Sequence, residues 1–319
     1  MSVANSTTGR LAALGLLLVL ATAVISGFST FLNSYAVAGT NSDAFVTVRN
    51  VAVAAMLAPV AIVVARQSPV KLRRADLGWL ALVGLVGGAI PFLLFFRGLE
   101  LATAAGGAAT ASFVYRALFL MATVFGVVFL GERVRPNVAA AAILLLGGNL
   151  LLLSLISPLW TPGTTYVFLA TVLWAGEYTL SKHLLGRLPS TTVGFGRMGF
   201  GAAFLVGYLA LTSQTGAVGA LSAVQWGWVA LSAVLLTAFV LTWYAGLKTT
   251  DLGVATSVLV LGFPVTWALT VLTHGARFTW LDGIGAAAVV AGVAVVAGRA
   301  RWRDLASAVR ATVLGRAAS

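Results

Sequence analysis

The chain has 319 residues, of which 60% are hydrophobic and only 9% are charged. A soluble domain carries about 25% charged residues, so this composition excludes a soluble globular protein and makes the lipid bilayer its solvent. Cysteine is absent, which excludes disulfides and thiolate metal sites. The net charge of +12 is accounted for by basic cytoplasmic loops rather than by nucleic-acid binding.

Ten apolar runs follow one another along the chain, and each is long enough for the roughly 20 residues that a transmembrane helix needs. The first five cover residues 11–34, 45–65, 77–96, 103–130 and 137–157. The second five cover residues 164–183, 194–213, 224–245, 252–273 and 279–298. We therefore predict an all-α integral membrane protein with ten transmembrane helices. Pro91 and Pro264 are expected to kink the third and ninth spans and to free backbone carbonyls there.

The two sets of five spans are copies of one another. The third span ends in an aromatic pair, one further residue and Gly-Leu (FFRGL, residues 95–99), and the pattern recurs 148 residues later as WYAGL. The same offset pairs Arg49 with Arg197. Because five is odd, the second copy must enter the membrane from the opposite side. This predicts two inverted five-helix repeats, residues 1–157 and 158–299, a design typical of secondary transporters.

The basic residues indicate an orientation. With the N-terminus in the cytoplasm, most of the 20 lysines and arginines fall in cytoplasmic segments. We therefore expect a multi-pass protein of the cell (plasma or inner) membrane with both termini cytoplasmic. Residues 300–319 form a basic cytoplasmic tail in which Trp302, Leu305 and Val309 fall near one helical face. The tail is predicted to be either an amphipathic helix on the membrane surface or a frayed segment that only enforces the topology.

Three features of the chain are shared with a known family. They are the five-plus-five plan, the two aromatic-x-Gly-Leu segments, and the segment Leu130-Gly131-Glu132-Arg133-Val134 after the fourth span. With these features, residues 10–299 resemble the drug/metabolite transporter superfamily in its ten-helix, EamA-type form. The second repeat departs from the pattern, because Gly275-Ala276-Arg277-Phe278 lacks the acidic residue.

The resemblance implies export or import of amino acids and other small metabolites, coupled to an ion gradient or run as an exchange. It also implies alternating access around a central cavity formed by spans 1, 3, 4, 6, 8 and 9.

Two charged residues lie deep in predicted spans, where a charge costs about 2.5–3.5 kcal/mol on insertion scales. They are Arg116 in the fourth span and Glu177 in the sixth, and the cheapest partner for each is the other. As a substrate site, Arg116 would bind a carboxylate or phosphate, and Glu177 would bind an ammonium group or carry a proton. The alternatives are a static buried ion pair and a Glu177 side chain that reaches toward Lys182 or Lys248.

Aromatic residues flank both charges in the sequence. Tyr115 precedes Arg116, and Trp174 and Tyr178 lie on either side of Glu177, so all three are candidate walls of a substrate pocket. Asn33 is a further candidate for a polar wall, with an interhelical hydrogen bond as the alternative.

Arg49 and Arg197 are placed by the repeat near the starts of spans two and seven. We consider two roles for them. One is gating at opposite mouths of the cavity, and the other is anchoring to headgroups or capping of helix ends.

No Gly-x-x-x-x-Gly-Lys-Ser/Thr loop, Ser/His/Asp set or paired-histidine motif occurs in the sequence. We therefore expect no enzyme activity, no cofactor or metal, no nucleic-acid partner and no ATPase subunit. The predicted function is a secondary-active transporter, either an exporter or a permease, of amino acids or of organic anions and zwitterions. A lone carboxylate is compatible with a coupled proton or with sodium. The alternative is a non-transporting membrane scaffold or sensor.

Overall fold

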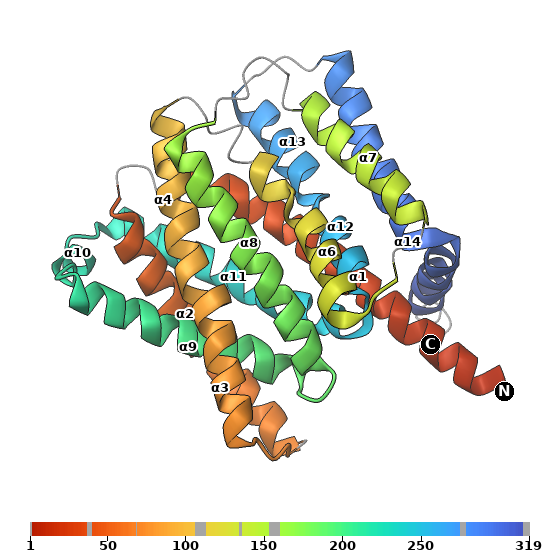
Figure 1. Cartoon of the computed structure of the whole chain (residues 1–319), viewed down its shortest axis with the longest axis horizontal. Helices are drawn as coiled ribbons and strands as arrows, with labels where there is room; N and C mark the ends of the chain where they lie inside the picture. Colours follow the sequence, from red (N-terminus) through yellow and green to blue (C-terminus); the bar gives the residue numbers. More distant parts are fainter. Residues whose placement is uncertain are drawn as a thin grey trace.

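The computed structural model describes residues 2–36, 40–67, 69–105, 113–133, 136–152, 160–274 and 279–314, and all regular structure within these ranges is helical. The first half contains α1 (Ser2–Ala36), α2 (Ser42–Gln67), α3 (Arg74–Val83), η1 (Gly84–Ala89), α4 (Ile90–Ala104), α6 (Leu118–Leu130) and α7 (Pro136–Leu152). The second half contains α8 (Pro162–Leu185), α9 (Ser190–Leu211), α10 (Gly216–Gly219), α11 (Ala223–Thr249), α12 (Leu252–Leu259), α13 (Gly262–His274) and α14 (Trp280–Leu314). Figure 1 shows these helices gathered into one bundle.

Eight stretches of the described chain are long and apolar enough to cross a membrane. They account for eight of the ten expected spans, so the multi-pass helical architecture is confirmed, whereas the count of ten is not. The two remaining spans are helical but fall short by length or by composition. The described apolar part of α7 covers only Ala139–Leu151, and α8 carries Glu177, Lys182 and His183 within its 24 residues.

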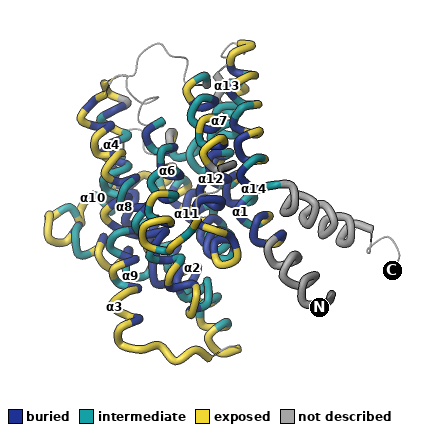
Figure 2. Tube along the Cα trace, turned by 45° about the vertical axis from the view of Figure 1, so that its right-hand side comes forward, coloured by how far each residue is buried: buried dark blue, intermediate teal, exposed yellow. Residues whose placement is uncertain are grey.

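The exposed faces of the bundle are apolar. Figure 2 shows buried residues on the inward sides of the helices and exposed residues around the periphery. Large apolar side chains at that periphery include Leu211, which is 88% exposed, and Ile143, which is 74% exposed. Such a surface suits lipid, because the bilayer core offers no hydrogen bonds to polar groups.

Helix packing relates the two halves by a two-fold pattern. By the repeat offset, α1 corresponds to α8, α4 to α11 and α6 to α13. Helix α1 of the first half packs against α11 and α13, and helix α8 of the second half packs against α4 and α6. Two further pairs, α2 with α9 and α7 with α14, each join a helix to its own repeat mate. Figure 1 shows α7 and α14 side by side along one flank. The core therefore lies where the two sets of five helices meet.

Irregular helix geometry accompanies both prolines. Pro91 has no N–H group to donate to the carbonyl of Gly87 four residues earlier, and the chain just before it forms the π-helix η1. In the ninth span, α12 ends at Leu259 and α13 begins at Gly262. Pro264 cannot donate to the carbonyl of Val260, which instead accepts a bond from Phe263 N at 3.0 Å.

Candidate functional site

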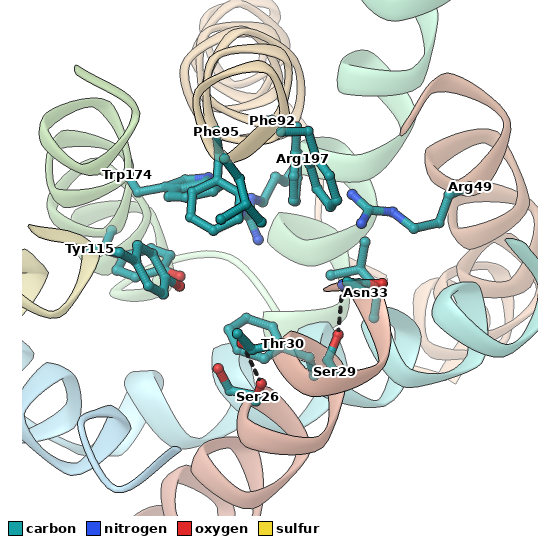
Figure 3. A pocket seen from close by; sticks show the side chains of 15 residues that line it. Ser26, Ser29, Thr30, Asn33, Arg49, Phe92, Phe95, Tyr115, Trp174 and Arg197 are labelled. Atoms are coloured by element: carbon teal, nitrogen blue, oxygen red, sulfur yellow. Dashed lines mark hydrogen bonds between the residues drawn. The ribbon is translucent and has the colours of Figure 1, made fainter. Parts of the chain in front are cut away.

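A cavity of about 680 Å³, partly open to the outside, lies between the two halves. Its walls come from α1, α2, α4, the helical turn at residues 113–116, α8, α9 and α11. Among the described residues, spans 2 and 7 therefore join the expected spans 1, 3, 4, 6 and 8, and the ninth span does not contribute. Figure 3 shows the side chains that converge on this cavity.

One wall is a polar strip on α1. Its members lie on one helical face and are Ser26, Ser29, Thr30 and Asn33. Asn33 Nδ2 donates to Ser29 Oγ at 3.2 Å, as drawn in Figure 3, and its Oδ1 accepts from Ser232 Oγ on α11 at 2.8 Å. Asn33 thus lines the cavity and also makes the interhelical bond considered as its alternative role.

The facing wall is aromatic. The ring centres of Phe95, Tyr115 and Trp174 lie 5.2–5.5 Å from one another and form a triangle. Tyr178 also lines the cavity, and its ring packs 4.6 Å from that of Trp243. The predicted wall residues Tyr115, Trp174 and Tyr178 are therefore brought together. A substrate with an apolar body would be enclosed by this wall.

Arg49 and Arg197 both line the cavity and are only 2% exposed. Figure 3 shows them reaching into the same space from α2 and α9. The Phe92 ring lies between them, 4.7 Å from the Arg49 guanidinium carbon and 5.6 Å from that of Arg197. The structure therefore places them in one cavity and not at opposite mouths, and their burial rules out headgroup anchoring. Their assignment as gates stays a prediction.

The π-helix positions Arg197 and the aromatic wall. The Gly87 carbonyl, within η1, accepts one bond from Arg197 Nη2 and one from Trp174 Nε1, both at 3.1 Å. A Cβ atom at Gly87 would overlap the Glu177 side chain, so only glycine allows this approach. The interruption of the third span thus fixes two residues of the cavity.

The same turn also positions Arg49, through Asn50. The Gly88 carbonyl accepts from Asn50 Nδ2 at 2.9 Å. Asn50 Oδ1 in turn accepts from Arg49 Nε and Nη2 at 3.2 and 3.0 Å. Both cavity arginines therefore depend on carbonyl groups of adjacent residues in η1.

Glu177 lies behind Arg197 and does not line the cavity. It is completely buried, and its Oε2 is 3.5 Å from Arg197 Nε. Its Oε1 accepts hydrogen bonds from Ser181 Oγ and, at 2.7 Å, from Tyr244 OH. The expectation that Glu177 pairs with Arg116 is therefore wrong. The face of α8 that carries Glu177 packs against α9 and α11. Arg116 lies elsewhere, beside the Tyr115 and Phe263 rings.

The ion pair between Glu177 and Arg197 is not hydrogen-bonded. Among the described residues, Glu177 Oε2 and the Nε and Nη1 atoms of Arg197 are buried without a hydrogen-bond partner. Arg197 therefore retains donors that an anion in the cavity could use.

Arg116 lies just before α6, beside the main cavity. It is 5% exposed, and its guanidinium carbon lies 5.4 Å from the Tyr115 ring centre and 5.2 Å from that of Phe263. It lines a separate space of about 260 Å³. Ser26 and Tyr115 border both spaces, so the two are adjacent.

Comparison with known proteins identifies the family. Residues 13–154 and residues 161–298 each match the model of the EamA-like transporter family. The chain belongs to the EamA-like transporter family. This membership is consistent with the drug/metabolite transporter superfamily. A solved structure titled "Crystal structure of protein" superimposes on this EamA-like chain with a TM-score of 0.69 and 22% identity, and it covers 88% of this chain and 97% of its own. No curated protein matches.

At the end of the bundle where α8 meets α9, polar contacts hold the helices of this EamA-like protein together. Lys182 Nζ donates to the carbonyls of Leu247 and Thr250 at 2.7 and 2.8 Å. Arg187 forms an ion pair with Asp76 at the start of α3. The opposite end, where α1 ends and α2 begins, is bridged as well. There Tyr208 OH donates to Asp43 Oδ2 at 3.1 Å, and Gln225 Nε2 donates to Thr40 Oγ1 at 2.6 Å.

Glu132, from the family segment after the fourth span, joins the two halves at the α8–α9 end as well. Its carboxylate accepts from the N–H groups of Leu252 and Gly253 at 2.7 and 3.3 Å, which caps the N-terminus of α12. The missing acidic residue of the second repeat falls at Ala276, which lies outside the described residues.

Sequence reasoning missed several cavity residues. Phe92, Phe95 and Phe96 line the cavity. The repeat motif includes Phe95 and Phe96 without indicating a cavity role for them, and no sequence pattern singled out Phe92. Asn50 was missed although it follows Arg49 directly, and an amide next to a buried arginine was the signal available. The substrate-binding roles of Arg116, Glu177, Tyr115, Trp174, Tyr178 and Asn33 remain predictions, and the first two lie next to the cavity rather than on its wall.

Proposed function

We propose that this protein is a secondary-active transporter of small organic anions in the cell membrane. The observation that carries the proposal is the charge of the cavity. Arg49 and Arg197 both line it, and no carboxylate belongs to its described lining. Guanidinium groups bind carboxylates through charge-assisted hydrogen bonds.

The shape of the cavity supports the same substrate class. The aromatic wall would hold an apolar body, and the polar strip of α1 would hydrogen-bond neutral polar groups. A zwitterion, such as an amino acid, would need an acceptor for its ammonium group. Glu177 is shielded behind Arg197, which leaves neutral acceptors such as Asn33 Oδ1 for this purpose. An anion therefore suits the cavity better than a zwitterion, and better still than a cation.

Alternating access is the proposed mechanism, with two inverted five-helix repeats rocking about the cavity. In this conformation the polar contacts of Lys182, Arg187 and Glu132 hold the α8–α9 end together. With the orientation expected from the basic residues, that end is cytoplasmic. The opposite conformation would break these contacts and open the cavity inward.

A proton is the proposed coupling ion. Arg197 lies between Glu177 and the cavity, so a bound anion competes with Glu177 for the same guanidinium. Once the anion engages Arg197, the Glu177 carboxylate loses a counter-charge and takes up a proton. Anion and proton then bind to the same conformation, which gives symport.

Uptake into proteoliposomes tests the function. A panel of labelled organic acids, amino acids and cationic dyes is offered with and without an inward proton gradient, and in parallel with a sodium gradient. We expect saturable uptake of an organic anion that the proton gradient drives and that Arg49→Gln abolishes. Preferential uptake of cations overturns the substrate class. The absence of flux from folded, inserted protein favours the scaffold or sensor alternative.

The proposed orientation has its own test, because the chain contains no cysteine. Single substitutions Ser307→Cys in the tail and Thr215→Cys between α9 and α10 are labelled in intact cells with a membrane-impermeant maleimide. We expect labelling at position 215 only. Labelling of position 307 in sealed cells contradicts cytoplasmic termini.

A further inference from the structure

Positive charge is in excess around the two adjacent spaces. Three guanidinium groups are buried there, those of Arg49, Arg116 and Arg197, and each is at most 5% exposed. The described surroundings supply one carboxylate, Glu177, which already faces Arg197. An uncompensated charge inside a membrane protein is strongly unfavourable, so such residues pair or line a site for an ion. Anions are the missing partners.

The positive charge of Arg116 is the least compensated of the three. Among the described residues it has neither an ion-pair partner nor a hydrogen-bond acceptor, and its buried Nε is unsatisfied. Its contacts are the faces of the Tyr115 and Phe263 rings. Ring faces attract a cation but offer no acceptor for its N–H groups, so they leave the hydrogen-bonding demand of the guanidinium unmet.

The space beside Arg116 has the chemistry for a small anion. It is narrow, with room for about one water-sized group, and the hydroxyl-bearing residues Ser26, Tyr115 and Thr256 border it together with Arg116. No polar side chain of this described lining is a carboxylate. Thr256 Oγ1 already donates to the Leu252 carbonyl at 2.8 Å, so Arg116, Ser26 and Tyr115 supply the N–H and O–H donors. Through Ser26 and Tyr115 the space adjoins the main cavity.

We propose that the Arg116 space is a second anion-binding site, which takes one carboxylate group or one chloride ion. The inference rests on the proposed function in one respect, since the first anion is the transported substrate at Arg49 and Arg197. The second anion has two sources. It is either the far carboxylate of a dianionic substrate that reaches past Ser26 and Tyr115, or a separate chloride ion bound beside a monoanion.

Binding to the purified protein in detergent tests the site without any need for flux. Thermal unfolding is followed by tryptophan fluorescence while chloride replaces a bulky sulfonate at constant ionic strength. Succinate and butyrate are then titrated in chloride-free buffer. The variants are Arg116→Gln and, as a matched control, Arg97→Gln, which removes an exposed arginine paired with Glu100.

If chloride is the ligand, it raises the unfolding temperature saturably in the wild type and in Arg97→Gln but not in Arg116→Gln. If the ligand is the far carboxylate, succinate binds and Arg116→Gln weakens it about tenfold to a hundredfold, the range for a lost charge-assisted bond, while butyrate is unaffected. Arg116→Lys, which keeps the charge, should retain part of either response and serves if the glutamine variant does not fold. Equal responses of wild type and Arg116→Gln, or no response to either anion, overturn the proposal.

The two proposals fail separately. Stabilisation by anions that requires Arg116, in a protein that transports nothing, refutes the transporter and leaves the site intact. If anion uptake requires Arg49, but the responses to chloride and to succinate are the same in the wild type and in Arg116→Gln, only the second site is refuted.

Discussion

The substitution Glu177→Gln distinguishes two roles for Glu177, a static ion-pair partner of Arg197 and a residue that couples anion binding to a proton. Glutamine keeps the shape of the side chain, and its carbonyl oxygen still accepts from Ser181 and Tyr244. The negative charge opposite Arg197 is lost, and an NH2 donor replaces the Oε2 acceptor that lies 3.5 Å from Arg197 Nε. The structure gives two expected consequences, one for the stability of the protein and one for its affinity for an anion.

The loss of stability follows from the geometry of the pair. At 3.5 Å and an effective dielectric constant of about 20, the attraction between the two charges is about 5 kcal/mol. Breaking a buried pair by removing one partner costs about 3–5 kcal/mol, which agrees with this figure. Arg197 borders a cavity that is partly open to the outside, so solvent compensates part of the loss. We therefore expect a clear fall in the unfolding temperature of the protein without substrate.

The affinity should change in the opposite direction. Arg197 is no longer shared, and its unsatisfied Nε and Nη1 become available to the anion. One further charge-assisted bond corresponds to about tenfold tighter binding or more. The bound anion also replaces the missing counter-charge, so it should restore much of the lost stability.

Anion binding and proton-driven uptake, measured on the wild type, Glu177→Gln and Glu177→Asp, provide the assay. We expect Glu177→Gln to bind more tightly, to exchange anions across the membrane, and to ignore a proton gradient. Glu177→Asp keeps the charge and should remain proton-dependent. If Glu177→Gln binds with wild-type affinity and still responds to the gradient, the shared-arginine reasoning is refuted and the pair is static.

Three further predictions concern the remaining parts of the site. Arg49→Gln should weaken anion binding about tenfold or more in a titration followed by tryptophan fluorescence, while Arg49→Lys keeps the charge and should lose less; equal affinities would contradict a role in binding. Gly87→Ala should destabilise the protein by about 1–3 kcal/mol in thermal or chemical unfolding, because its Cβ overlaps Glu177, whereas Gly78→Ala on α3 meets nothing within 4 Å and should be neutral or slightly stabilising. Lys182→Ala removes bonds to two carbonyls at the α8–α9 end, so a cysteine introduced in the cavity should react faster with a maleimide applied from that end; an unchanged rate would show that this end does not restrict access.

The sequence was sufficient for the all-helical membrane class and the two repeats, though not for a confirmed count of ten spans, because that information is periodic. Apolar runs and the 148-residue offset predicted helices, spans and repeat mates without any knowledge of packing. The offset also paired Arg49 with Arg197, but their depth was misjudged. The expected spans began at residues 45 and 194, whereas α2 begins at Ser42 and α9 at Ser190. Each arginine therefore lies seven residues into its helix, about 10 Å along its axis, and not near the helix end.

The partner of Glu177 could not be predicted in the same way. Sequence spacing gives the helical face that carries Glu177, with Trp174 and Ser181 beside it, but not the helix that this face meets. The break at Ala117 also turns Arg116 toward Phe263, and no residue pattern announced it. The proline at position 91 predicted an irregular turn in the third span, yet only the fold shows that Arg197 and Trp174 bind the Gly87 carbonyl in that turn.

The repeat explains why the cavity has two unlike walls. Shifted by the repeat offset, the polar strip of α1 falls on the inward face of α8. The pairs are Ser26 with Trp174, Ser29 with Glu177, Thr30 with Tyr178, and Asn33 with Ser181. One face of one ancestral helix thus carries small neutral side chains in the first copy and aromatic and acidic side chains in the second.

The two arginines, in contrast, are the same in both copies, and they meet because α2 packs against its own repeat mate α9. A residue on such a self-paired helix is brought close to its mate by the two-fold relation itself. Symmetry therefore supplies the paired positive charge, and divergence of α1 from α8 supplies the single carboxylate that only one arginine can face. That inequality leaves Arg49 without a carboxylate partner among the described residues, while Arg197 faces Glu177. The proposed coupling depends on this asymmetry, because a bound anion would compete with Glu177 for Arg197 only.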